Sequence, residues 1–107
     1  MRPRLSPLED RALAAFVGAV RERFGSRVAA VVLFGSRARG EGHAESDLDV
    51  LVLGHGLTRD DRRTVIDVAY DVELATRLVV APIVRDAARF DADSALGVEI
   101  ARDGVAL

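Results

Sequence analysis

The amino-acid sequence predicts an α+β fold, in which a small mixed β-sheet carries helices packed mainly on one face. Two long segments, at about 6–25 and 58–77, place apolar residues at helical spacing. Runs rich in β-branched residues alternate with these segments, at 28–34, 47–53 and 78–84. The 107 residues suffice for one domain with a modest core, so we expect 1–107 to form a single unit.

The long helices carry recognisable start and stop signals. Ser6 is a suitable N-cap for the first helix, and Glu9 three residues later completes a capping box. Gly25 is expected to end that helix. Thr58 and Asp61 repeat the starting pattern at the second long helix.

The remaining elements are shorter. A short helix is expected after the first strand, with Ser36 as its cap. A last helix starts at Asp93 or Ser94 and ends at Gly104. Residues 105–107 are expected to add a terminal strand.

The segment between the first two strands carries the strongest chemical signal. Gly35-Ser36 is followed by ten residues and then by Asp47-Leu48-Asp49. Gly35 lets the backbone turn and approach a ligand closely, and the free N–H groups of a helix start favour an anion. Residues two apart on a strand share a face, so we expect Asp47 and Asp49 to point the same way and Leu48 to face the apolar side.

Two carboxylates on one face repel each other, and a divalent cation would remove that cost. Oxygen ligands suit Mg²⁺, which commonly shares one or two carboxylates with substrate phosphates. The constellation therefore predicts a site for a metal-bound polyphosphate. A plainer interpretation is also open, in which Ser46-Asp47 forms a simple turn and Asp49 is an exposed strand residue.

At these residues the chain resembles the nucleotidyltransferase superfamily with the DNA polymerase β-like fold, and above all its small bacterial members, the minimal nucleotidyltransferases. The family signature, Gly-Ser, about ten residues and Asp-x-Asp, stands here as GSRARGEGHAESDLD. The resemblance implies a polymerase β-like fold. It also implies transfer of a nucleoside monophosphate, usually AMP from Mg-ATP, to an acceptor hydroxyl with release of pyrophosphate.

The resemblance further implies roles for individual residues. Gly35 and Ser36 would contact the β- and γ-phosphates of the nucleotide. Asp47 and Asp49 would be the catalytic residues that bind Mg²⁺, with two ions expected. ATP would be the substrate.

Two arginines stand beside this turn. Arg37 and Arg39 could neutralise the leaving pyrophosphate, so both are candidate nucleotide-binding residues. The alternative is two solvated arginines in a chain whose fifteen basic residues are all arginine.

One feature departs from the family pattern. Active members carry a third carboxylate on a later strand, facing the Asp pair, whereas the strand at 78–84 contains no acid and places Ala81 or Pro82 at the corresponding position. Pro82 also removes a ladder donor, which indicates an edge strand or a bulge. Other acids in this region are expected to be surface carboxylates, although each could in principle reach the site: Asp67, Asp71, Glu73 and Asp86.

Composition excludes several classes of protein. Half of the residues are hydrophobic and 30% are charged, as in ordinary globular proteins. The net charge of −2 and the scarcity of aromatic residues argue against nucleic-acid binding. No cysteine is present, so disulfides and thiolate metal sites are excluded. The sequence shows no signal peptide and no membrane-spanning run, and we expect a cytoplasmic protein.

The leading hypothesis is a Mg-dependent nucleotidyltransferase that places AMP from ATP on a hydroxyl of a partner protein. Larger relatives bind their acceptors through an additional region, so we expect another protein, or a second copy of this chain, to present the acceptor. Minimal members commonly pair with HEPN-domain proteins in toxin–antitoxin operons, which implies an antitoxin with a HEPN-domain partner. The alternative is a catalytically silent protein that binds nucleotide or masks its partner, supported by the missing third acid.

Overall fold

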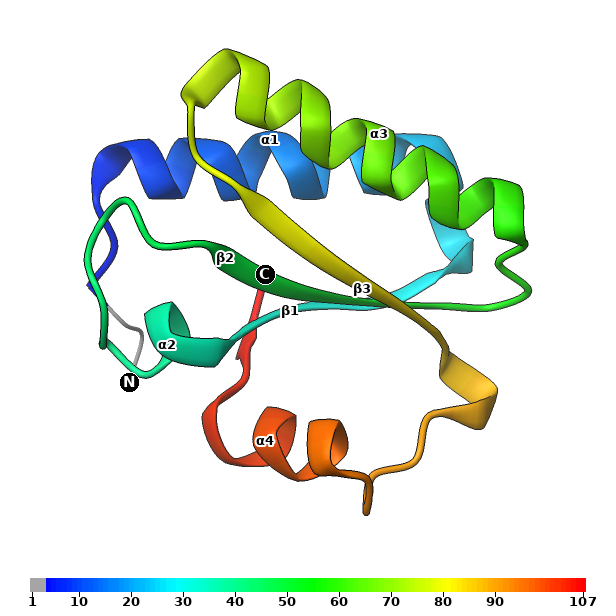
Figure 1. The fold of residues 1–107 in the computed structure, drawn as a ribbon. Helices are drawn as coiled ribbons and strands as arrows, with labels where there is room; N and C mark the ends of the chain where they lie inside the picture. Colours follow the sequence, from blue (N-terminus) through cyan, green and yellow to red (C-terminus); the bar gives the residue numbers. More distant parts are fainter. Residues whose placement is uncertain (1–3) are drawn as a thin grey trace.

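The computed structural model describes residues 4–107, which fold into a four-stranded mixed sheet covered by helices (Figure 1). The strand order is β3-β2-β1-β4, with β2 and β3 parallel and the other neighbours antiparallel. The helices are α1 (Pro7–Phe24), α2 (Gly35–Ala38), α3 (Arg59–Thr76) and α4 (Ala95–Asp103). The strands are β1 (Val28–Phe34), β2 (Leu48–Gly54), β3 (Val80–Asp86) and β4 (Val105–Ala106). Single-turn 3₁₀ helices cover Gly25–Arg27 and Ala87–Arg89.

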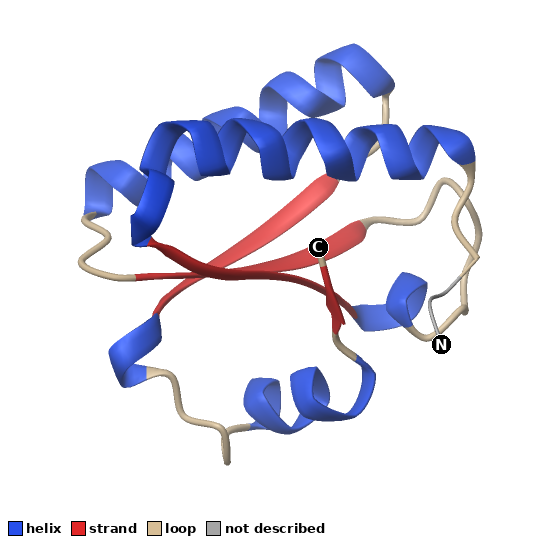
Figure 2. Cartoon of the chain, turned by 180° about the vertical axis from the view of Figure 1, so that it is seen from behind, coloured by secondary structure: helices blue, strands red, loops and turns tan. Residues whose placement is uncertain are grey.

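The helices form two unequal layers. α1 and α3 run side by side over one face of the sheet, while α4 lies on the other face (Figures 1 and 2). The expected α+β fold is confirmed, and α4 is the helix that departs from the main covered face. No helix in the part of the chain that the structure describes has the length and apolar character needed to cross a membrane.

Alternation along β2 separates the core from the other face of the sheet. Leu48 and Val50 are fully buried and belong to the same apolar cluster as Phe16 of α1 and Val65 of α3. Because side chains alternate along a strand, Asp49 points to the opposite face, on the side of α4. Because side chains on β2 point alternately to the two faces, a polar site at Asp49 can form only on the face opposite the core.

The capping signals read from the sequence are present. Ser6 and Glu9 form a capping box at the start of α1, and Thr58 and Asp61 form another at the start of α3. Ser94 caps α4 with its side chain. Each capping box satisfies two backbone N–H groups that a helix start otherwise leaves without partners.

The start of α2 differs from the prediction. The sequence suggests Ser36 as N-cap, whereas the helix begins at Gly35 and Phe34 is the N-cap. The φ angle of Gly35 is 76°, a left-handed value that lets the chain leave β1 and turn within one residue. Ser36 therefore lies inside the first turn of α2.

Two strands begin later than the sequence indicates. β2 starts at Leu48 rather than at Asp47, and β3 covers Val80–Asp86 rather than 78–84. Leu78 is 5% exposed and packs in the apolar cluster, so its hydrophobic character serves the connection from α3 and not the strand.

Candidate functional site

The turn at Gly35 lies directly against the carboxylate of Asp49. Phe34, the last residue of β1, pairs with Asp49 of β2, so the chain turns beside the aspartate. Gly35 is buried, and a Cβ at its position would overlap with Asp49 Oδ2. This contact and the positive φ both require glycine. The structure thus brings the two halves of the sequence motif together.

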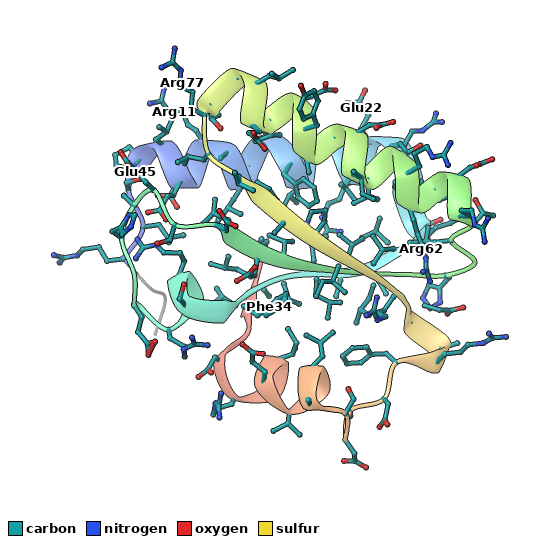
Figure 3. The ribbon with its side chains drawn as sticks, in the orientation of Figure 1. Arg11, Glu22, Phe34, Glu45, Arg62 and Arg77 are labelled. Atoms are coloured by element: carbon teal, nitrogen blue, oxygen red, sulfur yellow. The ribbon has the colours of Figure 1, made fainter. Side chains whose placement is uncertain are left out.

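The loop between α2 and β2 folds back onto the same turn. The Glu41 N–H donates to the Ser36 carbonyl at 2.8 Å. A Cβ on Gly42 would lie 2.8 Å from Ser46 Oγ and 3.5 Å from Ser36 Oγ, so the two hydroxyls border one small space. Figure 3 labels Glu45 in this loop. Ser36 therefore lies close to Ser46, the residue that precedes Asp47.

Asp47 and Asp49 are close enough to interact. Asp47 is exposed, and Asp49 is half-buried. Burial raises the pKa of the Asp49 carboxyl, and so do the charges of Asp47 and Glu99, whereas Arg39 opposes that shift. The structure therefore brings the two predicted carboxylates together on the side of the sheet that faces α4.

This pair of carboxylates fits Mg²⁺. Both side chains offer hard oxygen donors, and a cation would relieve the repulsion that contributes to the raised pKa of Asp49. Within residues 4–107, no three His, Cys, Asp or Glu side chains converge into a closed metal cluster. Two carboxylates suit a cation that also binds substrate phosphates, and Asp47 and Asp49 are the residues that would hold it.

Arg37 belongs to the folded framework and not to the open site. Its guanidinium forms a bidentate ion pair with Glu9, with Nε 2.7 Å from Oε2 and Nη2 2.9 Å from Oε1. Its Nη1 also donates to the Glu41 carbonyl at 2.8 Å. Arg37 is 7% exposed and Glu9 is fully buried, and the hydrogen bonds from Arg37 lower the pKa of Glu9. These contacts give Arg37 a structural role and occupy the guanidinium nitrogens that the sequence suggested for a phosphate contact.

Arg39 points to the other side, toward α4. Its Nη1 lies 3.3 Å from Oε1 of Glu99, and its Nε lies 3.2 Å from Oε2 of Glu41. The Arg39 side chain is 31% exposed, and its charge reaches Asp49. Arg39 is therefore a cation beside the acid pair that a ligand can still approach.

The neighbouring strand brings no acid to this site. Asp49 pairs with Ala81 of β3, and Pro82 lies on the same strand, which is an edge strand as the sequence indicates. Asp86 pairs with Gly54 at the far end of β3, five residues from Ala81 and hence about 16 Å away. The three candidate acids of α3 belong to the helix that packs on the opposite face of the sheet: Asp67, Asp71 and Glu73.

Glu99 is the acid near the site that sequence reasoning missed. It lies on α4, which contacts α2, and its charge contributes to the raised pKa of Asp49. The Glu99 side chain is 32% exposed. No motif surrounds Glu99 in the sequence. Only the course of α4 across this face of the sheet brings it to the site (Figure 1).

Comparison with known proteins relates this site to a family. The family model described as the nucleotidyltransferase domain matches residues 13–100, which include the turn and the acid pair. A Methanocaldococcus jannaschii protein named as a candidate protein adenylyltransferase is 33% identical over 72 residues. That match covers 67% of this chain and 62% of the relative, so the chain spans less than two thirds of that protein.

Solved structures share the fold. A candidate minimal nucleotidyltransferase is 28% identical, with a TM-score of 0.57 over 94% of this chain and 92% of its own. A toxin–antitoxin MntA-HpeT mutant gives a TM-score of 0.62 at 20% identity, over 97% of this chain and 72% of the matched chain. The structure of a tri-AMPylated Shewanella oneidensis HEPN toxin in complex with MNT antitoxin gives 0.54 at 14% identity, over 92% and 70%.

Proposed function

The chain belongs to the nucleotidyltransferase domain family, and from this premise we propose that it transfers AMP from Mg-ATP to a hydroxyl of a partner protein. The observation that carries the proposal is the contact between the Gly35 turn and the Asp49 carboxylate, beside Asp47. A phosphate-binding turn and an acid pair that meet in one place are the two parts that such a transfer needs.

In this proposal, Gly35 and Ser36 bind the β- and γ-phosphates through backbone N–H groups. The first N–H groups of a helix have no intrahelical partners, which supports this role for the start of α2. Arg39 supplies the nearby positive charge for the leaving pyrophosphate. Arg37 is not assigned to the phosphates, because its guanidinium is bonded to Glu9.

Asp47 and Asp49 hold Mg²⁺ in this proposal, with two ions as the resemblance implies. When bound, Mg²⁺ neutralises phosphate charge in the ground state and as the pyrophosphate leaves. The acceptor oxygen attacks the α-phosphorus, a new P–O bond forms, and the bond from the α-phosphorus to the bridging oxygen of pyrophosphate breaks. The two carboxylates, which would hold the cation, and the Gly35 turn would together fix the nucleotide so that these bonds lie roughly in line.

We further propose that the acceptor is a HEPN-domain toxin and that the chain is its antitoxin. The names of the relatives support this: one is a candidate protein adenylyltransferase, and others come from toxin–antitoxin complexes, one with an AMPylated HEPN toxin. The use of ATP fits a cytoplasmic site of action.

A second candidate function is a catalytically silent antitoxin that binds its partner without modifying it. The specific observation in its favour is Ala81, which occupies the strand position beside Asp49 where active relatives are expected to carry an acid. Both candidates require a complex with the partner, so only a covalent product separates them.

The test incubates the chain with α-labelled ATP, Mg²⁺ and the protein encoded by the adjacent gene, and measures label on denatured protein. We expect label with the wild type, none with Asp47→Asn, and full label with Asp67→Asn. Asp67 is a matched control because it is an exposed aspartate on α3. Absence of label, with a stable complex that inhibits the partner equally in wild type and Asp47→Asn, would support the silent antitoxin.

A further inference from the structure

We propose that a cavity at the other end of the sheet from the acid pair binds a small phosphate-bearing molecule. The cavity has a volume of about 480 Å³ and lies between the start of α3, the end of β3 and the start of α4. Sites for small molecules commonly enclose roughly 300–1,000 Å³. The inference goes beyond the proposed transfer reaction and does not depend on it.

The cavity is separate from the candidate site. Asp86 lines the cavity and pairs with Gly54 at the end of β2. Gly54 is five residues from Asp49 on the same strand, which corresponds to about 16 Å. Figure 3 shows Arg62 at one end of the sheet and Glu45, in the loop before the acid pair, at the other. A ligand in this cavity would therefore occupy a second site.

Three arginines from three different elements line the cavity. Arg62 lies at the start of α3, Arg85 in β3 and Arg89 in the 3₁₀ helix that follows β3. None of the three forms an ion pair within residues 4–107, and Arg85 Nη1 donates only to the neighbouring Val84 carbonyl, at 3.0 Å. Guanidinium groups bind phosphate oxygens through paired hydrogen bonds, so a phosphate would both use these donors and offset the concentration of positive charge.

Two aspartates also line the cavity, and each is engaged by the backbone. Asp86 Oδ1 accepts a hydrogen bond from the Ala88 N–H at 2.9 Å, and Asp91 Oδ1 accepts one from the Asp93 N–H at 2.8 Å. These carboxylates stabilise the local turns. Their charge also interrupts the basic surface, and single-stranded nucleic acid needs a continuous basic groove. The cavity therefore favours a compact anion.

Apolar side chains form another part of the wall. Phe90 follows Arg89 directly and is half-buried, and Leu96 of α4 lines the same space. A flat ring can pack against Phe90 while its phosphate contacts the guanidinium groups. A nucleoside monophosphate has both parts, whereas inorganic phosphate has the charge alone. AMP and inorganic phosphate are therefore the two probes.

The test titrates the chain with AMP or inorganic phosphate and follows the backbone amide resonances by NMR. The buffer contains EDTA and no Mg²⁺, so the cation proposed for the acid pair is absent. We expect the largest changes in chemical shift at Arg89 and Phe90 and small changes at Gly35 and Asp49. The double variant Arg62→Gln/Arg89→Gln should raise the Kd about 10-fold, because it removes two charged donors.

The matched control is the double variant Arg59→Gln/Arg63→Gln. Both residues are exposed arginines of α3 that do not line the cavity, and the change in net charge is the same. The control should bind AMP with the wild-type Kd. Equal weakening in the two double variants would assign the effect to overall charge and overturn the proposal. The spectra without ligand verify that each variant is folded.

The two probes identify the source of the phosphate group. A lower Kd for AMP than for inorganic phosphate would support a nucleotide ligand, and equal values would support the phosphate group alone. Absence of shifts at the cavity with both probes would overturn the proposal, as would tighter binding of a single-stranded RNA at the same residues. Neither result bears on the transfer reaction, which the labelled-ATP assay measures independently.

Discussion

Arg37 and Arg39 stand two residues apart but lie in opposite surroundings. Arg37 is buried against α1 in a bidentate pair with Glu9, and Arg39 is partly exposed toward α4, where it meets Glu41 and Glu99. The same residue type, in one short segment, is part of the framework on one side of α2 and part of the candidate site on the other.

The difference shows how the turn is supported and used. Glu9 and Arg37 are 28 residues apart, and their ion pair fastens the start of α1 to the segment that carries the turn. The contacts of Arg39 are longer and reach solvent, so a polyphosphate can replace them at little cost in stability. The buried Arg37–Glu9 pair thus supports the turn, and next to it the Arg39 side chain can change its partners.

The largest expected effect on stability comes from breaking the buried pair. Glu9→Ala leaves the Arg37 guanidinium buried without its carboxylate, and we expect the free energy of unfolding to fall by about 3–5 kcal/mol. Urea denaturation measures this loss. Glu22→Ala, at an exposed position of the same helix, is the control and should change it little. An equally small effect of Glu9→Ala would show that the pair does not support the turn.

The next effect concerns the turn that separates the two arginines from β1. Gly35→Ala would push a Cβ into the Asp49 carboxylate, and we expect the transfer rate to fall about 100-fold because the two halves of the site move apart. The labelled-ATP assay measures this rate.

Gly40→Ala is the matched control for that prediction. Gly40 has the same φ of 76°, but a Cβ there would meet open space. Both variants carry the strain of a left-handed alanine, and only Gly35→Ala disturbs Asp49. Equal losses of activity in the two variants would mean that backbone strain, and not the contact, is responsible.

A smaller effect should appear as a pH dependence of stability. The pKa of Glu9 in the folded protein lies below its ordinary value of 4.5, chiefly because Arg37 donates hydrogen bonds to it. The stabilisation that this gives is complete above the ordinary pKa and is lost as the pH falls through the lower folded value. The stability advantage of the wild type over Glu9→Gln should therefore shrink in this acid range. Denaturation curves at a series of pH values test this, and a constant difference would contradict it.

The smallest effect on stability is expected for Arg39→Gln. The ion pairs of Arg39 are open to solvent, so the denaturation midpoint should stay close to that of the wild type. The Kd for Mg-ATP should rise in the same variant, and the rise should be smaller at high salt. A large loss of stability with unchanged nucleotide affinity would reverse the roles assigned to the two arginines.

Local sequence patterns were enough to predict much of this fold. The capping boxes at Ser6 and Thr58 are confirmed, as are the alternation along β2 and the edge position of Pro82. Each depends on residues near one another in the chain or on a period that a strand imposes. The meeting of the turn with Asp49 follows from the same strand pairing.

Contacts between residues far apart in the sequence could not be predicted from local patterns. Nothing in the sequence distinguishes Arg37 from Arg39, because the partner of Arg37 lies on α1, far away in the chain. Likewise, Glu99 resembles any charged residue of an amphipathic helix until α4 is placed across the sheet. In both cases the missing information is which charged residues meet across the fold, and the periodicity of a helix or strand does not contain it.

The short strand β4 has a consequence for local opening. It contributes two residues to the sheet, at the end of the segment that carries α4, and pairs with Val32 and Leu33 of β1. Segments held by so few backbone hydrogen bonds open more readily than a central strand, so amide hydrogens of β4 should exchange faster than those of β2. Such an opening would uncover the sheet face beneath α4, including fully buried Leu51, without unfolding the layer formed by α1 and α3.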